Sequence, residues 1–287
     1  KQVVAMETDD VLFLTTSQLV SLTTAQVASF TTDQLVTLTT AQLSALKSAQ
    51  IAAMTTAQVV SLTTDQAGVL TTAQLSSMTT AQIVGLSTTQ SGGLSKDFAA
   101  ALTSAQVKAM ETADFSRLTT AAVQAVTNAA LAGLTTAQVA NMGTAQVAAL
   151  TDVQIKQLSS ANIQALTSDQ AKVLTQAQLG ALSSAQVAAM DTVDVAQLTS
   201  AQIRFLGNAA LTGLTTAQVN NLTTAQVAKM ETDDIAAITT AINAVTTATP
   251  PRVRFIQILR VLYMSRAIPE RSNNVAIKMN RGTEIST

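Results

Sequence analysis

The stretch TTAQVASF, residues 23–30, contains the pattern that decides the fold. Close copies of this octad follow one another along the chain, and every eighth residue from Met6 to Ile238 is apolar. A strict short repeat is typical of a solenoid, in which each unit buries its apolar face against its neighbours. The repeat therefore predicts one continuous array over residues 1–245.

Each octad carries the signals of a helix start. We label its positions a to h, with the apolar residue of the eightfold row at h; a is mostly Thr or Ser, d mostly Gln, and e mostly a large aliphatic residue. Thr23 and Gln26 form a capping box, in which the hydroxyl accepts from the N–H three residues on and the Gln side chain bonds the cap residue's N–H. Leu22 and Val27 flank the box as a hydrophobic staple. The octad therefore predicts one new helix per repeat.

The period of eight excludes the common alternatives. On one straight helix, the apolar row would drift by about 80° per repeat and form no face. A heptad coiled coil requires a period of 3.5 residues, and in a strand e and h would point to opposite sides. We predict an all-α solenoid or superhelix of very short capped helices, each of about six residues. Positions e and h should point inward, small residues at c and g should allow close approach, and b and f should face solvent.

Composition excludes several function classes. The chain contains no His and no Cys, so zinc sites and His- or Cys-based catalysis are not expected. It has no Gly-rich phosphate-binding motif, and its few carboxylates follow a regular array. It also lacks an apolar run long enough to span a membrane. We predict that the chain is not an enzyme, binds no cofactor and has no membrane span.

Four octads replace both polar box positions by acids. One interpretation is that the pairs ligate a hard cation such as calcium through oxygen atoms. The other is that carboxylates at a helix start favour the positive end of the helix dipole. The four pairs are Glu7 with Asp10, Glu111 with Asp114, Asp191 with Asp194, and Glu231 with Asp234.

Residues 87–99 are an irregular patch. Ser91 stands where other octads have a large residue at e, two glycines follow, and Phe98 occupies the Gln position. The patch is open to two interpretations: a hinge or partner-binding notch, or a tolerated irregularity that Phe98 partly fills.

The end of the chain differs from the array. Residues 246–251 form a Pro-containing break, and residues 252–287 form a basic segment with two apolar runs, expected to be extended or β. We interpret it as an assembly arm that docks on a neighbouring subunit, as a cap for the last coil, or as flanking sequence. Its basic residues carry no recognised nucleic-acid motif, so no nucleic-acid partner is expected. The arm residues are Arg252, Arg254, Phe255, Ile258, Leu259, Arg260, Leu262 and Tyr263.

The runs LTTAQVASF, LTTAQLSAL and MTTAQVVSL resemble the TTAQ-type octapeptide repeats of large repetitive exoproteins and adhesins of Gram-negative bacteria. The resemblance covers about residues 1–245 and implies an extracellular or cell-surface spacer, stalk or filament. We expect self-assembly head to tail into a filament, because Lys1 begins within a unit and an open first coil would receive the arm of the next copy. The alternatives are a monomeric stalk of a giant adhesin, and a module that binds ice, glycan or calcium through Thr rows or acidic repeats.

Overall fold

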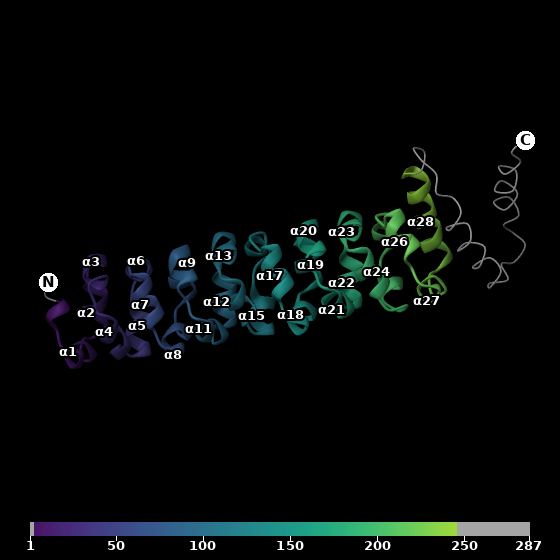
Figure 1. Cartoon of the computed structure of the whole chain (residues 1–287). Helices are drawn as coiled ribbons and strands as arrows, with labels where there is room; N and C mark the ends of the chain where they lie inside the picture. The colour runs from purple at the N-terminus through teal and green to yellow at the C-terminus, as the bar shows by residue number, and fades with distance from the viewer. Residues whose placement is uncertain (1–2, 246–287) are drawn as a thin grey trace, which may run out of the picture.

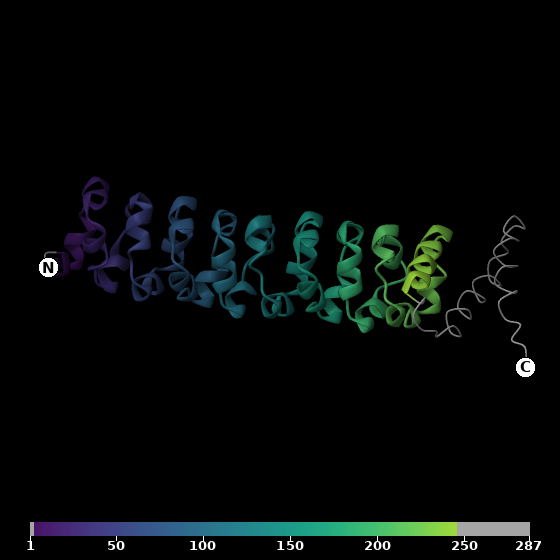
Figure 2. The ribbon, with the colours of Figure 1, turned by 90° about the horizontal axis from the view of Figure 1, so that it is seen from above.

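The computed structural model describes residues 3–245, and their side chains through residue 239. Within this range the chain forms short helices and no strands, and it winds into a row of coils that runs from the N-terminal to the C-terminal end (Figures 1 and 2). Both views show an elongated rod rather than a globule. The all-α repeat architecture predicted from the octad is confirmed.

A new helix begins about every eight residues. Along the chain the helices are η1 (Val3–Ala5), α1 (Thr8–Leu12), α2 (Thr16–Ser21), α3 (Thr24–Val27), α4 (Thr32–Thr37), α5 (Thr40–Ala45), α6 (Ser48–Ala52), α7 (Thr56–Ser61), α8 (Thr64–Gly68), α9 (Thr72–Ser77), α10 (Thr80–Val84), α11 (Thr88–Gly92), α12 (Lys96–Ala101), α13 (Ser104–Ala109), α14 (Thr112–Phe115), α15 (Thr120–Ala125), α16 (Asn128–Leu131), α17 (Thr136–Asn141), α18 (Thr144–Ala149), α19 (Asp152–Gln157), α20 (Ser160–Gln164), α21 (Ser168–Lys172), α22 (Gln176–Ala181), α23 (Ser184–Ala189), α24 (Thr192–Gln197), η2 (Ile203–Phe205), α25 (Asn208–Leu211), α26 (Thr216–Asn220), α27 (Thr224–Val227) and α28 (Thr232–Val245).

The capping box starts these helices. Thr23 has extended backbone angles of φ −72° and ψ 158°, so the chain turns there before α3 begins. The Thr23 hydroxyl accepts from the Gln26 N–H at 3.2 Å, and Gln26 Oε1 accepts from the Thr23 N–H at 2.8 Å. These bonds satisfy donors that the first turn of a helix leaves without an intrahelical partner. The local prediction from Thr-x-x-Gln is therefore confirmed.

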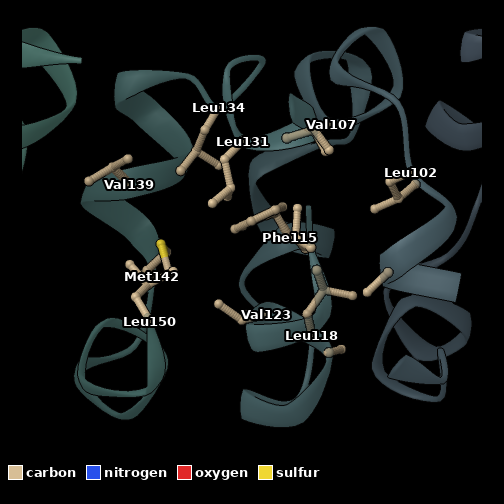
Figure 3. Packing of buried hydrophobic residues seen from close by; sticks show 14 of the residues in the cluster. Leu102, Val107, Phe115, Leu118, Val123, Leu131, Leu134, Val139, Met142 and Leu150 are labelled. Atoms are coloured by element: carbon tan, nitrogen blue, oxygen red, sulfur yellow. The ribbon is translucent and has the colours of Figure 1, made fainter. Parts of the chain in front are cut away.

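Packing occurs between coils rather than between consecutive helices. Each helix packs on the one three elements further along, as α12 does on α15 and α19 on α22. Positions e and h are buried through most of the array; a close view shows Val107 and Phe115 from e beside Leu118 and Leu134 from h (Figure 3). One continuous core runs along the rod, as a stack of short helices requires, because isolated helices of this length are unstable.

The polar positions follow the prediction with one exception. Positions a and b are largely exposed, f is exposed or half-buried, and g is mostly half-buried. The expectation that small residues at c mediate close approach is wrong, because c is exposed in octads such as Ala41 and Ala81. Position c lies in the first turn of each helix and faces solvent.

The helix α28 departs from the octad rule. It continues through Thr239, an a position at which a new helix was expected. The Thr239 hydroxyl does not act as a cap there; it donates to the Ile235 carbonyl at 2.7 Å, one turn earlier in the same helix. Position d of this last unit is Ile242, which cannot complete a capping box. The assembly-arm residues from Arg252 to Tyr263 lie outside the described residues.

Candidate functional site at the coil junctions

The Gln at position d joins each coil to the one before it. Gln138 is 1% exposed, and its Oε1 accepts from the Thr135 N–H at 2.9 Å to cap its own helix. Its Nε2 donates to the carbonyls of Val107 at 2.7 Å and Met110 at 2.8 Å, at the C-terminal end of α13. One side chain therefore caps the start of one helix and the end of another. Both helix ends would otherwise leave backbone groups unsatisfied.

This bridge recurs with constant register. In each case Nε2 donates to the h carbonyl 28 residues earlier, at 2.6–3.0 Å, and in most cases also to the carbonyl at e or f. All donors therefore point towards the N-terminal end of the rod. The bridging residues are Gln34, Gln42, Gln50, Gln58, Gln66, Gln74, Gln82, Gln90, Gln106, Gln138, Gln146, Gln154, Gln170, Gln178, Gln186, Gln202, Gln218 and Gln226.

The register gives the size of a coil, which the sequence did not. Helices pack three elements apart, while the Gln bond spans 28 residues, so one coil contains between three and four octads. Because 28 is not a multiple of eight, position d lies against h of the preceding coil.

The sequence interpretation assigned Gln only its capping role and missed the bridge. The sequence nevertheless contains a sign of the bridge. A capping box accepts Glu as readily as Gln, yet Glu is absent from position d of the octads between Glu7 and Ile238. Glu keeps the oxygen that caps the helix but has no N–H to donate. A consistent choice of Gln over Glu therefore indicates that the donor is used.

The acidic pairs fall into two structural types. In the first, Asp10 Oδ2 accepts from the Glu7 N–H at 3.4 Å, and Asp234 Oδ2 accepts from the Glu231 N–H at 2.8 Å. These Asp residues replace the capping oxygen of Gln. Glu231 also lies 3.7 Å from Arg204, in an exposed ion pair that adds little to stability.

In the second type, the Asp turns towards the preceding coil. Asp114 and Asp194 are 2% and 4% exposed. Asp194 Oδ1 accepts from the Ser168 hydroxyl at 2.5 Å, and the Asp114 carboxyl accepts from the Thr88 hydroxyl. Burial raises the pKa of both carboxyls above the ordinary 3.8; the hydroxyl partner lowers it in part, and the acid at position a raises it further.

The structure does not gather the acidic pairs into a larger cluster. Among the described residues, no group of three or more acidic side chains lies close enough to hold a metal ion. Calcium takes six to eight oxygen ligands, so one pair supplies a small part of a site. The first-turn position of these acids agrees with the dipole interpretation.

The irregular patch forms regular helices but contains one unusual polar group. Ser91, at position e of α11, is fully buried, and its hydroxyl has no hydrogen-bond partner. Ala occupies the same position in Ala67 and Ala171, both buried. Phe98 is 2% exposed and fills the d position of the next helix, as the second interpretation expected.

We expect Ser91→Ala to stabilise the rod. A buried hydroxyl without a partner costs about 1–3 kcal/mol, and Ala fits at this position elsewhere in the array. Urea unfolding is followed by circular dichroism at 222 nm. The midpoint should move to higher urea, and the free energy of unfolding should rise by about 1 kcal/mol. Ser76→Ala is the matched control, because its hydroxyl donates to the Ala73 carbonyl on the exposed side. A lower midpoint for Ser91→Ala would show that the hydroxyl is satisfied in solution.

Within the described residues, no helix has both the length and the apolar character required to cross a membrane. A search of curated proteins finds no match. The model of the ALTTAQ repeat family matches residues 3–40, 38–72, 107–144, 172–208 and 195–230. These segments together cover more than half of the chain, and they contain most of the bridging glutamines described above. The chain therefore belongs to the ALTTAQ repeat family.

Proposed function

We propose that this protein is a structural rod of the cell exterior that assembles head to tail into a filament. The observation that carries the proposal is the polarity of the Gln bridge. Every bridged coil presents amide donors towards one end of the rod and carbonyl acceptors towards the other. The two faces of a coil are therefore complementary and not identical. A contact between unlike faces that does not close on itself generates an open filament.

The regular coil stack also supports a structural role. The core is continuous along the rod, and its apolar residues are mostly small or aliphatic ones that make many similar contacts. Among the described residues, the buried polar side chains are mainly the bridging glutamines, which connect coils. The proposed location rests on the resemblance to repetitive exoproteins and on the absence of Cys. The second candidate is a monomeric stalk that separates other domains, which the elongated shape favours equally (Figure 1).

Negative-stain electron microscopy over a concentration series tests the proposal. We expect long fibres of uniform width that become more abundant as concentration rises. A chain that ends at residue 249 should lose these fibres if residues 252–287 act as the assembly arm. Fibres that persist without the tail would exclude residues 252–287 as the assembly arm but would still support the filament. Isolated short rods at every concentration would exclude the filament and favour the stalk.

A further inference from the structure

Two coil junctions inside the rod lack the amide donor and instead contain a buried acid. Asp114 and Asp194 occupy position d, where the register assigns the acceptor 28 residues earlier: the carbonyls of Leu86 and Leu166. An ionised carboxylate accepts hydrogen bonds but donates none. It therefore cannot form the bridge that Gln forms at the neighbouring junctions. Its contact with the preceding coil is the hydrogen bond from Thr88 or Ser168.

Asn162 shows what a side chain of the same length does in this position. Its Nδ2 donates to the Leu134 carbonyl, 28 residues earlier, at 2.9 Å. Its Oδ1 accepts from the Ser159 hydroxyl at 2.8 Å. An Asp side chain therefore reaches the acceptor at position h. A protonated carboxyl has the donor that this bond requires, because its O–H replaces one N–H of the amide.

The surroundings of both carboxyls favour the protonated form. Asp114 lies on α14, between α11 and α17, and neither of these two helices contains a charged residue. The charged neighbours within its own octad are Glu111 and Arg117. Desolvation is the main reason that the pKa of Asp114 is raised, and the negative charge of Glu111 adds to it.

The Asp194 junction has one additional ion pair nearby. Asp194 lies on α24, between α21 and α26, and α26 contains no charged residue. On α21, Lys172 pairs with Asp169 at 3.1 Å, so its charge is already partnered. Within its own octad Asp191 is the charged neighbour, and it raises the pKa of Asp194 in addition to desolvation.

We propose that Asp114 and Asp194 are proton-operated junctions of the rod. When protonated, each carboxyl donates to the h carbonyl of the preceding coil and closes the junction as Asn162 does. When ionised, it leaves that carbonyl without its donor, and the junction is held by the Ser or Thr hydroxyl and by apolar packing. The two coil boundaries are then places where the rod weakens as pH rises.

The sign of the pH effect follows from linkage. Because the native pKa of each carboxyl is raised, the native state binds the proton more tightly than the unfolded state. Stability from these two groups is therefore fully present below the ordinary value of 3.8 and is lost as pH rises through the raised native pKa. The junctions should be closed in acidic solution below that value and weaker at neutral pH.

The test compares the full-length protein with an Asp114→Asn/Asp194→Asn variant by hydrogen exchange and mass spectrometry. Asn has the shape of protonated Asp and supplies a donor at every pH. Both proteins are measured at the same pH, so intrinsic exchange rates cancel. At pH 7 we expect amides of residues 111–118 and 191–198 to exchange roughly fivefold more slowly in the variant, equivalent to about 1 kcal/mol. At pH 3, below the ordinary value of 3.8, the difference should disappear.

An Asp33→Asn/Asp65→Asn variant is the matched control, because both acids are exposed first-turn residues at position c. It should leave exchange at both junctions unchanged. Equal exchange of the wild-type protein and the junction variant at pH 7 would overturn the proposal. A difference that is the same at pH 3 and pH 7 would also overturn it, since it would show a structural effect without a proton. The outcome is independent of whether the rods form filaments.

Discussion

Gly133→Ala is expected to destabilise the rod by about 3 kcal/mol or more, as overpacking of a close contact does. A Cβ at Gly133 would lie 1.9 Å from the carbonyl oxygen of Ser104 and 2.7 Å from its carbonyl carbon. These are backbone atoms of the preceding coil, so no side-chain rotation relieves the clash. The two coils would have to separate.

The close approach accompanies the loss of the bridge. The octad of Gly133 has Ala130 at position d in place of Gln, and its helix α16 packs on α13 through the small residues. The octad 80 residues later repeats the combination with Ala210 and Gly213, and there a Cβ would lie 2.0 Å from the Ser184 carbonyl oxygen. Gly213→Ala should therefore have an effect of the same size.

Urea unfolding followed by circular dichroism measures the effect, with Gly68→Ala as the control. A Cβ at Gly68 meets no atom within 4 Å, and Gly68 lies at the end of α8. Ala should stabilise this helix by about 0.5–1 kcal/mol, because it restricts the unfolded chain and has the higher helix propensity. The two substitutions therefore have opposite signs. Equal midpoints for Gly133→Ala and Gly68→Ala would contradict the close packing of α13 and α16.

Gln138→Glu is expected to destabilise the rod by about 2–4 kcal/mol at neutral pH. The substitution keeps the oxygen that accepts from the Thr135 N–H, so the capping box remains. It removes both bonds to the carbonyls of Val107 and Met110, in a position that is 1% exposed. Each buried carbonyl left without a donor costs about 1–3 kcal/mol, and the new charge is itself buried.

Acidification provides a second measurement on the same variant. A protonated Glu has one O–H to donate, so part of the lost stability should return as pH falls. Gln18→Glu is the control, because Gln18 is exposed and its side-chain oxygen bonds only within the capping box with Thr15. It should change the free energy of unfolding by less than about 1 kcal/mol. A comparable loss in both variants would show that the change from Gln to Glu acts at the helix start and not through the bridge between coils.

The local features of the fold were predictable from the octad because they depend on residues close in sequence. Thr23 and Gln26 belong to one helix start, and the burial of positions e and h follows from helix periodicity. The bond from Gln138 to Met110 joins residues 28 positions apart, and no local rule specifies that distance. The size of the coil depends on this long-range contact, so it required the structure.

The two candidate junctions could be predicted from the sequence only in part. The sequence singled out Asp114 and Asp194 as departures from the repeat, but it could not distinguish them from Asp10 and Asp234. That distinction depends on whether the carboxyl turns to its own helix start or to the preceding coil. Desolvation raises the pKa of Asp114 and Asp194.

The register of the Gln bridge has a consequence for how such a gene can change. A span of 28 residues equals three and a half octads, and positions d and h are half an octad apart. Removing or inserting any whole octad therefore shifts the downstream chain but still places every d residue against an h carbonyl. Unequal recombination between neighbouring repeats would yield proteins of different lengths that fold at once, without compensating substitutions at the junctions. Rod length is then a heritable quantity that varies in steps of eight residues.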